Sequence, residues 1–246
     1  ARLGLAAGPV GSDEEGNARG LYRKHCAHCH GITGDGAGPT AAFLNPYPRD
    51  YRKGQFKFKS TPVGRRPTHL GLKKIVLEGI PGTAMPSFKL LPDMEVEALV
   101  DYVKYLSIRG EVERALLRAT VELEEGKRLV SVVDKNAPAE QKAAQQEQVT
   151  AVKEIVAGVV GVWEAADGES AAIPPRPALT KETLTASIHR GRALFYGTVA
   201  NCVKCHGESA LGDGNLAEYH DWTKEFIDLG NNPKLTRDYV SLGMLP

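Results

Sequence analysis

Two Cys-x-x-Cys-His motifs constrain this chain more than any other feature. The four cysteines form two pairs, and a histidine follows each pair at once: Cys26, Cys29 and His30, then Cys202, Cys205 and His206. This spacing is the signature of covalent haem attachment, because two thiols on one turn of chain reach the vinyl groups on one edge of the macrocycle. The adjacent imidazole then lies over the ring and ligates the iron. The sequence therefore predicts two covalently bound haem c groups, with the two motif histidines as iron ligands.

Two other uses of paired cysteines fit the sequence less well. A zinc site can combine two such pairs, but here more than half the chain separates them, and each has its own flanking repeat. A thioredoxin-like redox pair needs a preceding strand, whereas both motifs follow segments with a helical pattern. Covalent haem at both motifs remains the leading hypothesis.

The segments around the two motifs repeat each other. Residues 191–195 (Gly-Arg-Ala-Leu-Phe) repeat residues 18–22 (Ala-Arg-Gly-Leu-Tyr), and a Gly-Asp-Gly sequence occurs at 34–36 and again at 212–214. A helical segment, a thiol pair, a histidine and a glycine-rich loop thus recur in the same order. This order indicates a duplicated unit.

Met85 is the candidate distal ligand of the first iron. It lies in a loop rich in Gly and Pro between two expected helices, 68–78 and 93–107, where a methionine of the apolar core is less expected. Histidine with methionine is an axial pair of cytochromes c, and methionine raises the reduction potential. We therefore expect His30 and Met85 to ligate the first iron.

Residues 14–108 resemble a class I cytochrome c domain, and the resemblance resumes near residue 187. It is carried by the first motif, the glycine-rich loop ending at Pro39, the Gly-Thr-Ala-Met85-Pro loop and the following helix. The resemblance implies a small all-helical fold in which the first and last helices cross. It also implies that the His30 imidazole donates a hydrogen bond to the carbonyl of Pro39.

Other side chains of the first unit are candidates for the surroundings of the haem. A contact with the haem propionates and a solvated surface role are both open for Tyr51, Arg65, Arg66 and His69.

We expect an all-α protein in which a helical linker joins two cytochrome c-like domains. The expected parts are a flexible tail, a first domain, a helical linker with a Pro-rich end, and a second, partial domain: 1–13, 14–110, 111–178 and 179–246. Helices are predicted over 14–25, 68–78 and 93–107. Two more are predicted in the linker, and the second of these covers 141–166. A coiled coil that docks a partner is the alternative for the linker, but its heptads are irregular.

The second unit departs from the first at its end. It has no proline at the position of Pro39, and only two residues follow Met244. One alignment places Met244 opposite Met85 as the distal ligand. Another aligns residues 242–246 with residues 44–48, and the distal ligand of the second iron would then lie beyond residue 246. His220 and an open iron site are further alternatives. We expect the second domain to be incomplete and the chain to be a fragment of a longer protein.

Charge and hydropathy exclude some classes of partner. The 31 Lys and Arg residues balance 30 Asp and Glu residues, so there is no overall attraction to nucleic acid or an anionic membrane. No apolar run approaches the roughly 18 residues of a membrane-spanning helix, so a membrane anchor would lie upstream of the chain.

Electron transfer is the leading functional hypothesis, because an iron with two strong axial ligands has no open position for substrate. The chain would then be an electron carrier rather than a catalyst, with other cytochromes, an oxidase or a dehydrogenase as redox partners. The alternatives are a dihaem peroxidase-type oxidoreductase, whose second iron is open, and a haem subunit of a larger respiratory complex. Covalent attachment of haem outside the bacterial cytoplasm, which the resemblance implies, predicts a periplasmic location.

Overall fold

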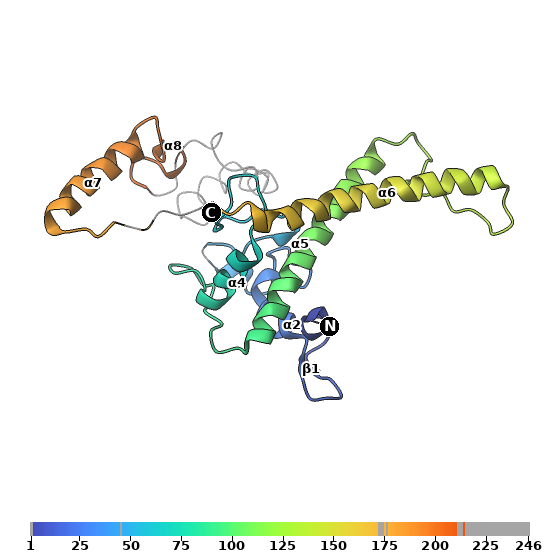
Figure 1. Ribbon diagram of the computed structural model, residues 1–246, viewed down its shortest axis with the longest axis horizontal. Coiled ribbons are helices and arrows are strands. Elements are labelled where there is room, and N and C mark those ends of the chain that lie inside the picture. The colour runs from blue at the N-terminus through green and yellow to red at the C-terminus, as the bar shows by residue number, and fades with distance from the viewer. Residues whose placement is uncertain (1, 45, 172–174, 176, 211–213, 215–246) are drawn as a thin grey trace. The chain divides into compact units, whose positions relative to one another are not determined.

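The computed structural model describes residues 2–44, 46–171, 175, 177–210 and 214 (Figure 1). Met244 and His220 lie outside these residues. The α-helices are α1 (Arg2–Ala6), α2 (Leu21–His25), α3 (Ala27–His30), α4 (His69–Glu78), α5 (Asp93–Val121), α6 (Ala139–Ala165), α7 (Lys181–Tyr196) and α8 (Val203–His206). The described residues also form the short 3-10 helices η1 (Ala41–Phe43), η2 (Tyr51–Lys53) and η3 (Ala166–Gly168). In the described part the strands are β1 (Gly11–Ser12) and β2 (Ala18–Arg19), which pair antiparallel. The expected all-α class is confirmed.

The chain divides into two compact units. The first contains Ala1–Ala41, Pro48–Pro81 and Met85–Ala172, and the second contains Ile173–Pro246 with two short segments, Ala42–Tyr47 and Gly82–Ala84. In the described part, no helix is long and apolar enough to cross a membrane.

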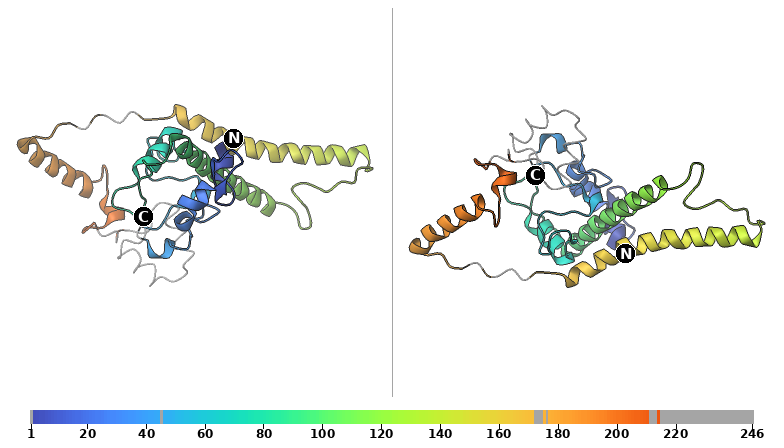
Figure 2. Two further views of the ribbon diagram at one scale, coloured as in Figure 1. Left: turned by 90° about the horizontal axis from the view of Figure 1, so that it is seen from below. Right: turned by 90° about the horizontal axis from the view of Figure 1, so that it is seen from above.

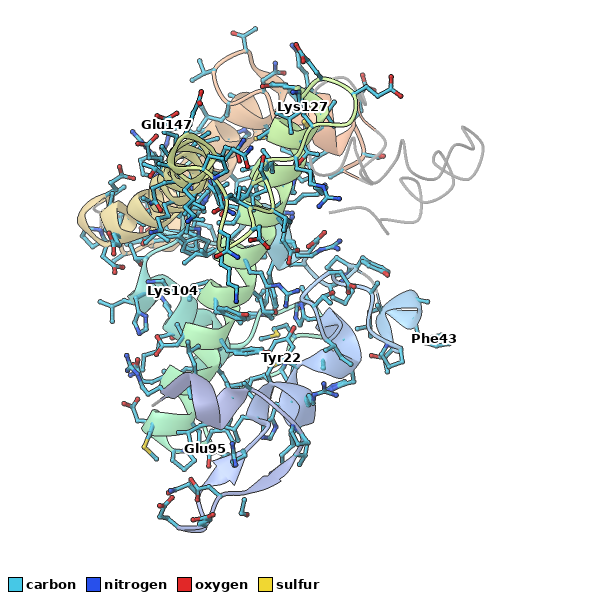
Figure 3. The ribbon with its side chains drawn as sticks, turned by 90° about the vertical axis from the view of Figure 1, so that its right-hand side faces the viewer. Tyr22, Phe43, Glu95, Lys104, Lys127 and Glu147 are labelled. Atoms are coloured by element: carbon cyan, nitrogen blue, oxygen red, sulfur yellow. The ribbon has the colours of Figure 1, made fainter. Side chains whose placement is uncertain are left out.

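The core of the first unit forms where α2 packs against α5. Leu21 and Tyr22 of α2 are 0% and 1% exposed, and they share one apolar cluster with Leu99 and Leu106 of α5. Figure 3 shows Tyr22 beside α5, and its ring lies 5.0 Å from that of Tyr102. Aromatic and aliphatic residues at helical spacing thus bury one face of each helix.

The segment before α2 differs from the prediction. Residues 2–6, expected in a flexible tail, form α1, which packs on α5 with Ala6 fully buried. Arg2 also pairs with Glu97 at 3.0 Å and with Asp101 at 2.9 Å. These contacts with a helix far along the sequence hold the N-terminal residues against the domain. No local sequence pattern predicts them.

The first motif helix also starts later than expected. The predicted helix 14–25 is observed only from Leu21, because β1 and β2 form a small hairpin upstream. Gly20 precedes α2 with φ +66°, and a Cβ there would overlap the backbone of Pro9. That left-handed conformation favours glycine and interrupts the helix.

The helices flanking the Met85 loop agree with the prediction. Thr68 caps α4, its hydroxyl accepting a hydrogen bond from the Gly71 N–H at 2.9 Å. The next helix, α5, begins at Asp93 as expected. It does not end near Gly110, however, but continues to Val121, and α6 then returns to pack on it (Figure 2). One continuous helix therefore runs from the core of the first unit into the segment that was expected to be a linker.

Replacing glycine by alanine is expected to have opposite effects on stability at two positions in the helices. A Cβ at Gly110 of α5 would overlap the backbone of Arg52 in η2, whereas a Cβ at Gly158 of α6 meets nothing within 4 Å. We expect Gly110→Ala to lower the free energy of unfolding by about 1–3 kcal/mol through overpacking. We expect Gly158→Ala to raise it by about 0.5–1 kcal/mol, because alanine favours a helix. Chemical denaturation of both variants checks this, and equal shifts would contradict the close approach of η2 to α5.

Candidate haem sites

The first motif forms a single helical turn. The N–H groups of Cys29 and His30 both donate to the carbonyl of Cys26, at 3.1 and 2.9 Å. The two cysteines are free thiols. Burial raises the pKa of Cys26 to about 12, and the Cys29 sulfur lies 3.3 Å from the Thr40 hydroxyl. Two free thiols and an imidazole are thus held on one turn.

His30 is prepared to act as a neutral ligand. Its Nδ1 lies 3.1 Å from the Arg49 carbonyl, and burial lowers the pKa of His30 to about 4. At neutral pH the imidazole is therefore uncharged, and with Nδ1–H donating to the carbonyl, the lone pair of Nε2 is available for a metal. The free thiols and this imidazole are the donor set that haem c requires, so the residues fit the group.

The acceptor of that hydrogen bond corrects the sequence prediction, which assigned it to Pro39. Pro39 is exposed, and the loop of residues 48–50 reaches His30 instead. Gly36 permits this approach, because its φ is +75° and a Cβ there would lie 2.5 Å from the Pro48 carbonyl oxygen. Sequence reasoning missed Arg49 because a backbone acceptor leaves no signal in a side chain.

Tyr51 lies directly against the imidazole of His30. The two rings stack with centroids 4.6 Å apart and an interplanar angle of 21°. Tyr51 is 7% exposed, and its N–H donates to the Gly34 carbonyl at 2.7 Å. Of the four candidates for the haem surroundings, Tyr51 is thus the one that stacks on His30.

The other three candidates are engaged by carboxylates. Arg66 pairs with Glu111, and Arg65 lies 3.5 Å from Glu169. His69 Nε2 lies 2.8 Å from Glu97. Carboxylates of the first unit therefore contact all three side chains.

The Met85 loop is closed by hydrogen bonds and packs toward the motif helix. The Ile80 N–H donates to the Met85 carbonyl at 3.2 Å, and the Phe88 N–H donates to the Val76 carbonyl at 3.1 Å. Phe88 meets His25, the residue before Cys26, edge-on at 5.9 Å. The loop is therefore held between α4 and α5, and Met85 is half-buried in it.

The second motif repeats the turn of the first. The N–H groups of Cys205 and His206 donate to the Cys202 carbonyl at 3.2 and 2.9 Å, and Gly207 then turns the chain with φ +74°, as Gly31 does in the first motif. The four cysteine side chains are all partly buried, but His206 is exposed. The described part of the second unit thus contains the complete Cys-x-x-Cys-His turn.

Two described glycines after the motifs occupy equivalent places, in a register that differs from the Gly-Asp-Gly alignment. A Cβ at Gly38 would overlap the carbonyl of His28, and a Cβ at Gly214 would overlap that of Lys204, the equivalent residue of the second motif. Ala210 occupies the place of Gly34 and has φ +59°. Gly214 therefore corresponds to Gly38, two residues later than the sequence repeat implied.

Of the comparisons with known proteins, the match to a family model agrees with the first site. No curated protein sequence matches the chain. A solved structure described as the Kuenenia stuttgartiensis reducing HAO-like protein complex Kustc0457/Kustc0458 matches with a TM-score of 0.44 and 25% identity, over 84% of this chain and 67% of that chain. Residues 14–103 match the family model described as cytochrome C oxidase, cbb3-type, subunit III. Residues 14–103 are therefore a class I c-type cytochrome domain, a domain that binds covalent haem c and transfers electrons.

Proposed function

We propose that this chain is a dihaem c-type cytochrome that passes single electrons between redox proteins. The observation that carries the proposal is the second motif, whose backbone hydrogen bonds repeat those of the first turn within 0.1 Å (3.2 against 3.1 Å at the second cysteine, 2.9 Å at both histidines). Such a turn presents two thiols and an imidazole to one macrocycle. Cys202 and Cys205 would therefore hold a second haem, with His206 as its proximal ligand.

The residues of the chain hold the haem and set its properties. Haem c supplies the one-electron iron couple when bound, and the chain supplies axial ligands, burial and hydrogen bonds. The Arg49 carbonyl orients the His30 imidazole and increases its basicity. The thioether of Met85, as distal ligand, would raise the potential of the first iron. For the second iron we propose Met244 as the distal ligand.

The proposed setting is the periplasm, with other cytochromes, an oxidase or a dehydrogenase as redox partners. Covalent attachment of haem c takes place outside the cytoplasm, and the cytochrome c domain of residues 14–103 supports this location. Residues 14–103 match a subunit of an oxidase, which favours a respiratory chain as the source or destination of the electrons.

Counting haem by intact mass tests the proposal. We expect two haem c masses on the wild-type chain and one on Cys202→Ser/Cys205→Ser, because thioether bonds cannot form without the thiols. The matched variant Cys26→Ser/Cys29→Ser should retain the second haem. A wild-type chain that carries one haem, with the same haem count on the Cys202/Cys205 variant, would refute the dihaem assignment.

An electron paramagnetic resonance spectrum of the oxidised wild-type protein then separates a carrier from an enzyme. Two low-spin ferric signals are expected if both irons are six-coordinate. One low-spin and one high-spin signal would contradict the simple carrier and indicate an open second iron. In that case, turnover of hydrogen peroxide with an added reductant is the measurement that would establish a peroxidase.

A further inference from the structure

A series of aromatic rings connects the iron ligand of the first unit with the linker helix α6. His30 stacks on Tyr51 at 4.6 Å, and Tyr51 stacks on Phe56 at 5.9 Å with an interplanar angle of 11°. Phe56 then meets Trp163 of α6 edge-on, at 6.1 Å and 89°. Trp163 lies 133 positions after His30 in the sequence, yet the series between them contains two side chains, Tyr51 and Phe56.

Trp163 is firmly held at the end of this series. It is 1% exposed and packs with Leu72 of α4 and with Val96 and Val100 of α5. Its indole N–H donates to Glu111 Oε1 at 2.8 Å. A buried aromatic residue with its polar atom satisfied has few alternative positions.

Glu111 is itself fixed by a second partner. Arg66 Nε donates to Glu111 Oε1 at 3.0 Å, and Arg66 also pairs with the second carboxylate oxygen. Gly54 lies against this group, and a Cβ there would overlap the carboxylate. The network of Trp163, Glu111 and Arg66 therefore locks α6 onto the cytochrome domain.

Tyr51 has little freedom on its other sides. Its N–H is bound to the Gly34 carbonyl at 2.7 Å, and η2 lies against α5, where Gly110 leaves no room beside Arg52. Asp50 caps η2, accepting from the Arg52 N–H at 2.9 Å. Phe56 also stacks on the Tyr51 ring, and Trp163 meets Phe56 edge-on.

We propose that Trp163 is a positioning residue for the proximal ligand His30, so that the linker helix α6 is part of the first haem site. The Arg49 carbonyl fixes one nitrogen of the imidazole, and the Tyr51 ring fixes its plane. Trp163 holds that ring in place through Phe56. The inference rests on haem at the first motif and is independent of haem at the second.

The test uses the full-length holoprotein with Cys202→Ser/Cys205→Ser, so that every signal comes from the first haem. In this background we expect Trp163→Ala to broaden or shift the low-spin ferric resonance, because the imidazole plane is no longer fixed. The midpoint potential should fall, because water that enters beside the ligand favours the charged ferric form. Trp163→Phe keeps a ring against Phe56 and should restore most of both properties. Val162→Ala, at a neighbouring position of α6 that is 43% exposed, should match the parent.

A purely structural role gives a different result. Trp163→Ala would then lower the midpoint of thermal unfolding while the resonance and the potential stay at the parent values, and this outcome would overturn the proposal. If Trp163→Ala yields no holoprotein, Phe56→Leu replaces it, because leucine keeps apolar volume but removes the ring between Tyr51 and Trp163. An altered resonance and a lower potential in Phe56→Leu support the proposal, and parent values refute it.

Discussion

Met85→Ala is expected to convert the first haem from low-spin to high-spin and to lower its midpoint potential. Alanine supplies no donor atom, so the sixth position would be left to water, and the contribution of the thioether to a high potential would be lost. The loop that presents Met85 is closed by its own backbone, through the Ile80 N–H at 3.2 Å. A Cβ at Gly79 would also lie 2.6 Å from the Met85 carbonyl oxygen. The substitution should therefore remove the ligand without opening the loop.

Two matched variants separate ligation from packing in this measurement. Met85→His supplies a different ligand and should keep the iron low-spin, but at a lower potential than the wild type. Met94→Ala removes a methionine that is 53% exposed on α5 and should leave both the spin state and the potential unchanged. Electron paramagnetic resonance measures the spin state, and a redox titration measures the midpoint potential. A low-spin Met85→Ala with an unchanged potential would mean that another residue ligates the first iron.

Leu99→Ala is expected to lower the free energy of unfolding by about 2–5 kcal/mol. Leu99 is 1% exposed and lies in the cluster where α2 crosses α5, next to the segment that ends at Cys26. The truncation removes apolar contacts and leaves a cavity that the rigid helix crossing cannot close. Because a domain of this size is only marginally stable, a loss at the upper end of this range would populate the unfolded chain.

Leu117→Ala is the control for that substitution. Leu117 lies on the same helix but is 65% exposed, so the change should stay within about 0.5 kcal/mol. Urea denaturation of the holoproteins measures both variants. Equal losses would show that the α2–α5 crossing is not the main source of stability.

Local sequence patterns predicted the parts of the fold that depend on local chemistry. The spacing of the motif fixed the helical turn from Cys26 to His30, and Thr68 and Asp93 marked the starts of α4 and α5. The burial of α1 could not be predicted in this way, because it depends on Arg2 meeting α5. Contacts between residues far apart in sequence have no local period.

For the candidate haem site, too, local features could be predicted from the sequence, and contacts between residues far apart in sequence could not. The spacing of the motifs predicted the helical turns, whereas the stacking of the Tyr51 ring on His30 was not predicted, because Tyr51 was expected beside the haem propionates or at the surface. The acceptor for His30 was placed at Pro39 instead of Arg49, because any residue offers a carbonyl and only the path of the chain selects one. The role of Trp163 was missed because it depends on which side chains the buried ring contacts, and the sequence does not show those contacts.

The continuity of α5 decides where this protein can be divided. The sequence predicted a domain boundary at Gly110, but a cut there would sever α5 one residue before Glu111 and discard Trp163. Leu72 and Val100 would then lose their apolar cover. The smallest part of this chain that can be expressed as an intact cytochrome domain accordingly extends through α6. The pair of helices α5 and α6 belongs to that domain and cannot be removed as a spacer.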